Sequence, residues 1–141
     1  MPAIDRTLAV MQAVRAALMA DATMAALVGD RIYDAAPEGT ASPYVTIGHT
    51  NYSDASTSSS EAQDFSIDIH CFDIPADVSN APDTSRVRAA MAHVRRVLHD
   101  TELSIPGSNL IVCRVTRAVS PLPTQDEIHG VTTLRVLAGH E

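Results

Sequence analysis

The sequence contains no lysine, so its ten basic side chains are all arginines, and 17 acidic residues outnumber them. The formal net charge is therefore −7. Nonspecific binding of duplex DNA depends on clustered lysine and arginine side chains that release counterions from the phosphates. The charge balance predicts a protein that does not bind DNA, and it is equally consistent with acidity that only keeps the domain soluble.

Cysteines and long apolar runs are also scarce. Cys71 and Cys113 each lie in a strand-like alternation, without the dense, regular spacing of a disulfide scaffold. We predict two buried free thiols, with a bridge as the alternative if their strands are neighbours. No uninterrupted apolar run approaches the ~20 residues that a membrane helix needs, so we expect a soluble protein made in the cytoplasm, with no membrane contact.

Two helical segments are predicted before residue 30. Apolar residues recur at helical spacing in the first, at Ile4, Leu8, Met11, Val14 or Arg15, and Leu18. Asp21 or Thr23 can cap a short second helix through residues 24–28. Gly29 then occupies the position where a left-handed C-cap favours glycine, because no side chain opposes a positive φ.

Three extended segments follow. A short one covers residues 31–34, and a strand begins behind Pro43 and runs from Tyr44 to Tyr52. Its partner has the clearest alternation in the chain, with Phe65, Ile67, Ile69 and Cys71 on one face and Asp64, Ser66, Asp68 and His70 on the other. The polar segment 53–62 predicts a long mobile hairpin tip, either a binding element that orders on a partner or a tolerated insertion.

The second half repeats a helix and a hairpin. After a connector at residues 74–82, Asp83, Thr84 or Ser85 can cap a helix that ends near residue 99 and buries Val87, Met91, Val94 and Leu98. Strands are predicted at residues 110–119 and about 128–138; the last has apolar residues on both faces, as a central strand or a subunit interface would.

These elements predict one α+β domain over residues 1–141. We expect an antiparallel sheet of about four strands with two main helices packed on one face, in the order helix, hairpin, helix, hairpin. A chain of 141 residues can bury roughly 68% of its unfolded surface, so a core without disulfides is feasible.

Catalytic and metal-binding patterns are nearly absent. His49 and His70 lie on strands that should pair, and with Asp68 they could approach one another on the polar face, but a zinc site needs three or four convergent ligands. Asp64 and Asp68 share a strand face without any marked cleft for acid–base catalysis. There is no glycine-rich phosphate loop and no nucleophile elbow. We therefore expect no catalytic, cofactor or metal site and no enzyme activity.

The run Leu27, Val28, Gly29, Asp30, Arg31, Ile32, Tyr33 and the strand Pro43, Tyr44, Val45, Thr46, Ile47 follow an amphipathic helix. This order of features resembles the tail-completion or tail-terminator proteins of long-tailed phages and gene transfer agents. The resemblance implies a structural virion protein that forms a ring, sixfold in the family, on the end of the tail tube. There it would stop tube growth and join the tail to the head connector.

The implied partners are other copies of the chain, the major tail tube protein and a head–tail connector or stopper protein. DNA would pass through the lumen without specific binding. The location would be the head–tail junction of the particle, assembled in the host bacterial cytoplasm. Two alternatives stay open: another head–tail connector or stopper component, and a small cytoplasmic enzyme or ligand-binding domain of similar fold.

Candidate partner-binding residues follow from this reading. Segment 51–63 is the candidate for partner contact or the lumen, with Tyr52 as apolar anchor and Asp54, Glu61 and Asp64 as its charges. Arg31 is predicted in a structural ion pair beside the connector, with interface contact as the alternative. On the polar face of the second main helix, Arg88 and Arg95 are either solvated or meet an acidic neighbouring subunit.

Overall fold

A computed structural model describes residues 4–74, 83–123 and 127–140, with side chains omitted at 120–123. The helices are α1 (Thr7–Ala20), α2 (Ala22–Val28) and α3 (Ser85–Leu98); the strands are β1 (Ile32–Tyr33), β2 (Tyr44–Asp54), β3 (Glu61–Asp73), β4 (Asn109–Pro123) and β5 (Ile128–His140). The five strands form one sheet in the order β1-β2-β3-β5-β4. All pairs are antiparallel except β1 with β2.

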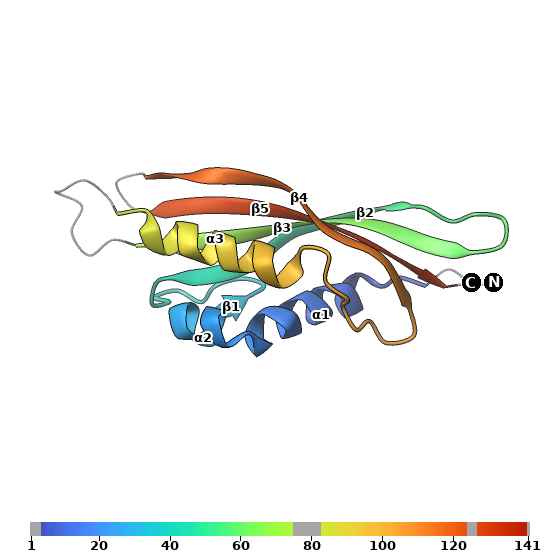
Figure 1. The fold of residues 1–141 in the computed structure, drawn as a ribbon, viewed down its shortest axis with the longest axis horizontal. Helices are drawn as coiled ribbons and strands as arrows, with labels where there is room; N and C mark the ends of the chain where they lie inside the picture. The colour runs from blue at the N-terminus through green and yellow to red at the C-terminus, as the bar shows by residue number, and fades with distance from the viewer. Residues whose placement is uncertain (1–3, 75–82, 124–126, 141) are drawn as a thin grey trace.

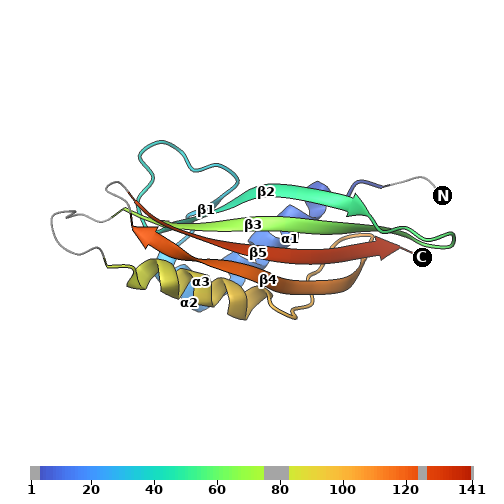
Figure 2. The same cartoon turned by 90° about the horizontal axis from the view of Figure 1, so that it is seen from above.

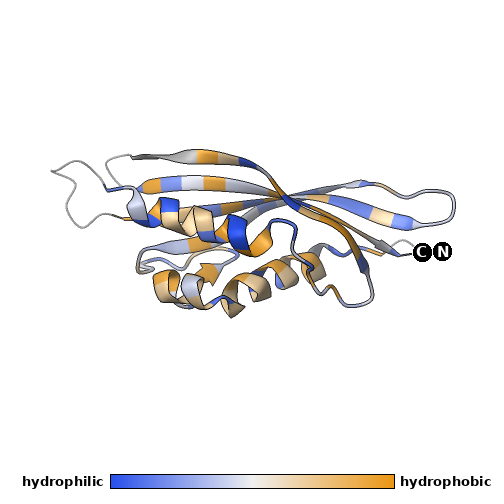
Figure 3. Cartoon of the chain, viewed as in Figure 1, coloured by the Kyte–Doolittle hydropathy of each residue, from blue (hydrophilic) through white to orange (hydrophobic). Residues whose placement is uncertain are grey.

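The helices pack on one face of this sheet, which confirms the predicted α+β architecture (Figures 1 and 2). The predicted alternation in β3 is confirmed as well, because Phe65, Ile67, Ile69 and Cys71 are fully buried. Figure 3 shows α1 and α2 as mostly apolar, whereas α3 carries strongly polar residues beside its apolar ones. The short parallel strand β1, paired with β2 through Ile32 and Val45, adds a fifth strand at the edge.

The buried face of α1 differs from the predicted one. Val10, Val14 and Leu18 are fully buried, whereas Ile4 is 46% and Leu8 is 67% exposed. The helix has alanine, leucine or methionine on nearly every side, so its apolar pattern does not define a single face. No single helix in the described chain is long and apolar enough to cross a membrane; α1 and α2 reach that length only as a pair bent by 87°.

The ends of α2 follow the predicted local chemistry, whereas the N-cap residue of α3, Thr84, makes no side-chain capping hydrogen bond. The Asp21 carboxylate accepts a hydrogen bond from the Met24 N–H at 2.9 Å and caps α2. Gly29 ends α2 with a φ of 62°, as predicted for the C-cap. Before α3, the Asp83 carboxylate accepts a hydrogen bond from the Ser85 N–H at 2.9 Å. Of the predicted connector at residues 74–82, all but residue 74 lies outside the described residues.

The loop between β2 and β3 is shorter than the predicted hairpin tip, and hydrogen bonds close it. Pairing continues to Asp54 and resumes at Glu61, so only residues 55–60 form the loop. The Ala55 N–H donates to the Ala62 carbonyl at 2.9 Å, and the Thr57 N–H donates to the Ser60 carbonyl at 2.8 Å. Serine, threonine and aspartate side chains satisfy backbone groups there, which gives a polar loop a defined turn without apolar burial.

Candidate partner-binding surfaces

The β2–β3 hairpin tip and the start of the chain enclose a pocket of about 600 Å³. Three of the predicted partner-binding residues line it: Tyr52, Asp54 and Glu61. The Tyr52 side chain is 49% exposed and lies 5.6 Å from the Phe65 ring, between ring centroids. This arrangement leaves a large amphipathic ring available at the end of the hairpin.

Arg6 fixes one wall of this pocket. Each of its two terminal guanidinium nitrogens lies 2.7 Å from one oxygen of the Glu61 carboxylate. The Arg6 backbone N–H donates to the Gln63 side-chain oxygen at 2.8 Å. The Arg6 hydrogen bond holds the pKa of Glu61 below its usual value. The Glu61 carboxylate is thus already paired with an arginine of the same chain. Arg6 was not among the predicted residues, since one arginine before a helix gives no signal in sequence that it will be buried.

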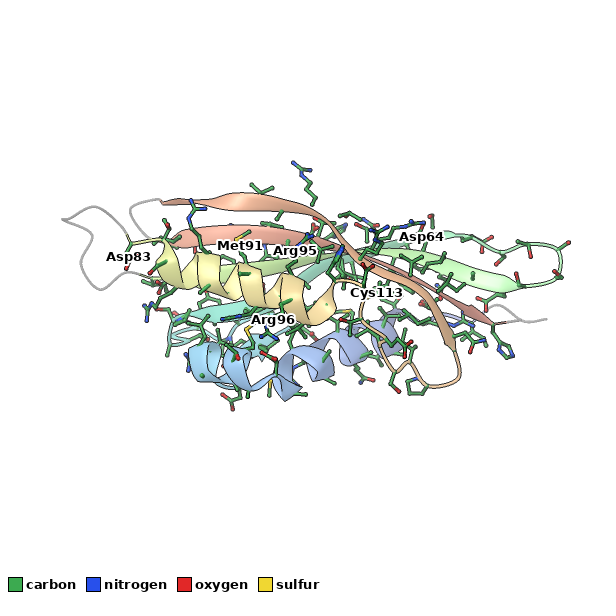
Figure 4. All side chains as sticks on the ribbon, in the orientation of Figure 1. Asp64, Asp83, Met91, Arg95, Arg96 and Cys113 are labelled. Carbon is green, nitrogen blue, oxygen red and sulfur yellow. The ribbon has the colours of Figure 1, made fainter. Side chains whose placement is uncertain are left out.

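Asp64 lies away from the hairpin pocket, on the sheet face opposite the helices. Its carboxylate pairs with Arg135 of the neighbouring strand β5, at 2.9 Å from the terminal guanidinium nitrogen. Figure 4 labels Asp64 on this upper side of the sheet. The structure therefore places Asp64 in a cross-strand ion pair, outside the pocket that Asp54 and Glu61 line. Tyr52 borders both that pocket and a second hollow beside Asp64 and Arg135.

The three predicted arginines lie apart from the hairpin. The Arg31 guanidinium donates to the Pro43 carbonyl at 3.0 Å, and it forms no ion pair with any described residue, so the predicted ion pair is wrong. A backbone carbonyl fills that role because Arg31 lies directly before β1, beside the start of β2. Arg88 donates to the Thr84 hydroxyl at 3.0 Å, whereas Arg95 lines a hollow between α3 and β4.

The imidazoles of His70 and His129 share a hydrogen bond of 2.7 Å across β3 and β5, so His70 bonds a histidine that the sequence did not pair with it. Gly48 makes room for this, because a Cβ there would lie 2.6 Å from His70 Cδ2. Burial, and next the charge of His129, lower the pKa of His70. No group of three or more metal-ligating side chains occurs in the described parts of the chain.

Both cysteines are buried free thiols, as predicted. The alternative bridge is ruled out by the strand order, since β5 lies between the strands that carry Cys71 and Cys113. Burial raises the pKa of Cys71 to about 12 and that of Cys113 to about 11. Thiols with such values carry almost no thiolate near neutral pH and are poor nucleophiles.

A family model described as "Tail completion protein gp17" matches residues 12–138, nearly the whole described fold. The chain belongs to the tail completion protein family. This confirms the resemblance seen in the sequence and identifies a structural protein of phage tails, not an enzyme.

A solved structure supports the same relationship. This tail completion protein matches a chain of a structure titled "Virion of native gene transfer agent (GTA) particle" with a TM-score of 0.84 and 26% sequence identity. The match covers 98% of this chain and 100% of that one. No curated protein matches the sequence.

Proposed function

We propose that this tail completion protein forms a homohexameric ring that caps the tail tube, ends tube growth and joins the tail to the head connector. The observation that carries the proposal is the match over 98% of the chain to a complete chain of a gene transfer agent particle. Its place is then the head–tail junction of a virion or phage-like particle, assembled in the host bacterial cytoplasm. Its partners are other copies of itself, the tail tube protein and a connector or stopper protein.

The sheet has the features that such a ring needs. A closed ring is built from heterologous contacts, in which two different surfaces meet and the rotation between copies closes. β4 and β1 are the edge strands of this sheet, and an edge strand offers unpaired N–H and C=O groups to a neighbour. Ile111 on β4 adds an apolar side chain that is 59% exposed.

The hairpin suits a contact along the ring axis, because it extends beyond the helical layer at one end of the molecule (Figure 1). Tyr52 offers an apolar anchor there, and Asp54 adds a negative charge. The net charge of −7 fits a ring whose lumen lets DNA pass without holding it.

The test is electron microscopy of particles made with this gene deleted and then restored. A terminator predicts overlong, headless tails that return to uniform length on complementation. Tails of normal length that fail to join heads would assign the protein to a connector or stopper role instead. Particles unchanged by the deletion would refute a role in tail assembly.

A further inference from the structure

Two arginines of this acidic protein have no hydrogen-bond or ion-pair partner for their side chains among the described residues. Eight of the ten arginines bond a carboxylate, hydroxyl or carbonyl of the chain: Arg6, Arg15, Arg31, Arg86, Arg88, Arg96, Arg114 and Arg135. Arg95 and Arg117 have no such bond to any described residue, yet both line the same hollow. Two unpaired cations on one concave surface point to an anionic ligand.

The hollow lies between α3 and β4 and has a volume of about 370 Å³. Met91, Val115 and Ala118 supply apolar walls beside the two guanidinium groups. Figure 4 labels Met91 and Arg95 on the part of α3 that borders the sheet. The surface therefore combines apolar contact with positive charge, which fits a polypeptide segment better than a small anion.

Thr132 gives an independent sign that a polar group belongs in this hollow. Its side chain lines the hollow and is only 1% exposed, and its hydroxyl has no hydrogen-bond partner among the described residues. Buried hydroxyls in folded proteins are nearly always hydrogen-bonded. A carboxylate that enters between the arginines would accept a hydrogen bond from this hydroxyl as well.

The unpaired acidic side chains gather on a different part of the molecule. In the described ranges, only Asp30, Asp34, Glu38 and Glu102 have carboxylates without a hydrogen bond or ion pair. Three of these four lie in residues 30–38, which we call the acidic connector. All three are exposed.

The hollow and the acidic connector lie at opposite edges of one sheet. β4 borders the hollow, β1 lies within the connector, and the strand order separates them by four strand spacings, roughly 19 Å at about 4.8 Å each. Figure 2 shows that the chain after β1 projects past β2, on the side away from α3 and β4. It lies toward the same end of the long axis as α3. The two surfaces cannot meet within one copy, but adjacent copies can bring them together.

We propose that the acidic connector of one copy docks into the Arg95–Arg117 hollow of the next copy and forms the contact that closes the ring. This inference rests on the proposed ring function and names its interface. We choose a second copy as the partner that fills the hollow, because the acidic connector at the opposite edge of the sheet carries the charge that complements the two arginines. Such a contact joins two different surfaces and repeats around a ring.

The absence of lysine allows a direct test in assembled particles. Arg117→Lys and Arg95→Lys each keep the charge and introduce the only side-chain amine of the protein. A water-soluble carbodiimide joins an amine to a carboxylate in contact with it, with no spacer. Particles carrying either variant are treated with this reagent, and linked peptides are identified by mass spectrometry.

We expect a link from Lys at position 117 or 95 to Asp30, Asp34 or Glu38, which must join two copies because the edges are too far apart in one. Arg96→Lys is the control for the reaction: its partner Asp21 lies 2.7 Å away in the same chain, so it should give an internal link. Arg88→Lys, which is on the same helix but does not line the hollow, should not link to the acidic connector.

Links from the hollow to a tail tube or connector protein would overturn the choice of a second copy as occupant. A working Arg96→Lys control with no link from either hollow variant would overturn the contact altogether. Either failure is distinct from failure of the ring function, which the deletion experiment measures through tail length.

Discussion

At the residue scale, the pairing of His70 with His129 makes stability depend on pH. The pKa of His70 lies below its ordinary value of 6.5, chiefly because of burial and next because of His129. The unfolded chain therefore binds a proton at a higher pH than the folded chain does. Stability from this group is present above about pH 6.5 and is lost as the pH falls through that value toward the lower folded pKa.

Replacing His70 with glutamine should reduce this loss. We expect the denaturant midpoint of the wild type to fall more between pH 7.5 and pH 5.5 than that of His70→Gln. His140→Gln serves as the control, because its side chain is exposed at the end of β5 and the wild-type slope should persist. A His70→Gln variant with the full wild-type slope would contradict this account.

Single residues differ in how far their roles could be predicted from sequence. The Asp21 cap, the glycine at position 29 and the buried cysteines follow from local rules that need no partner. Arg6 and His70 do not, because each is defined by a side chain 55 or 59 positions away in the chain. The wrong prediction of an ion pair for Arg31 has the same origin, since only the β1–β2 pairing brings the Pro43 carbonyl to it.

At the element scale, β3 and β5 approach each other closely at Gly139. A Cβ there would lie 2.5 Å from the Glu61 carbonyl oxygen and 2.8 Å from Ala62 Cβ. Both atoms are held by the β3 backbone, so the clash can be removed only if that backbone moves. We predict that Gly139→Ala lowers the free energy of unfolding by about 1–3 kcal/mol, the usual cost of overpacking. Chemical denaturation of both proteins measures it.

Gly130→Ala is the matched control on the same strand. The added Cβ would collide with Met91 Sδ and lie 3.2 Å from Val87 Cγ1, but the methionine side chain is flexible and can move aside. Its loss of stability should therefore be the smaller of the two. A larger loss for Gly130→Ala would show that Met91 cannot yield, and it would contradict the prediction.

The buried face of an element was predictable where the sequence has a strict period and was not where it has none. The alternation in β3 indicated its buried face correctly, because a period of two leaves only two choices. The alanine-rich α1 offered several apolar stripes, and the buried one includes Val10 instead of Leu8. The length of the hairpin tip was overestimated, because hydrogen bonds between short polar side chains and the backbone leave no hydrophobic pattern.

At the scale of the whole molecule, the sequence indicated the family but not the interface. Arg95 on α3 and Arg117 on β4 are about 60 and about 80 residues from the acids after α2, and nothing in their spacing relates them. Their significance comes from strand order, which places β1 and β4 at opposite edges. Local alternation does not encode that order.

The head-to-tail contact predicts how charge-reversed copies behave together. One variant, Arg95→Glu with Arg117→Glu, presents an acidic hollow to an acidic connector; the other, Asp34→Arg with Glu38→Arg, presents a basic connector to a basic hollow. Each alone should fail to restore normal tails to the deletion strain, because every contact in its ring is repulsive. Produced together, the two variants should restore tail length, since alternating copies make every contact attractive.

Alternation closes only in a ring with an even number of subunits, as in the proposed hexamer, so the mixture also tests ring parity. A chain carrying all four substitutions has attractive contacts in any ring and supplies the control. Rescue by this chain but not by the mixture would mean an odd ring with the proposed contact intact. Normal tails from either two-substitution variant alone would show that ring closure does not depend on this charge pairing.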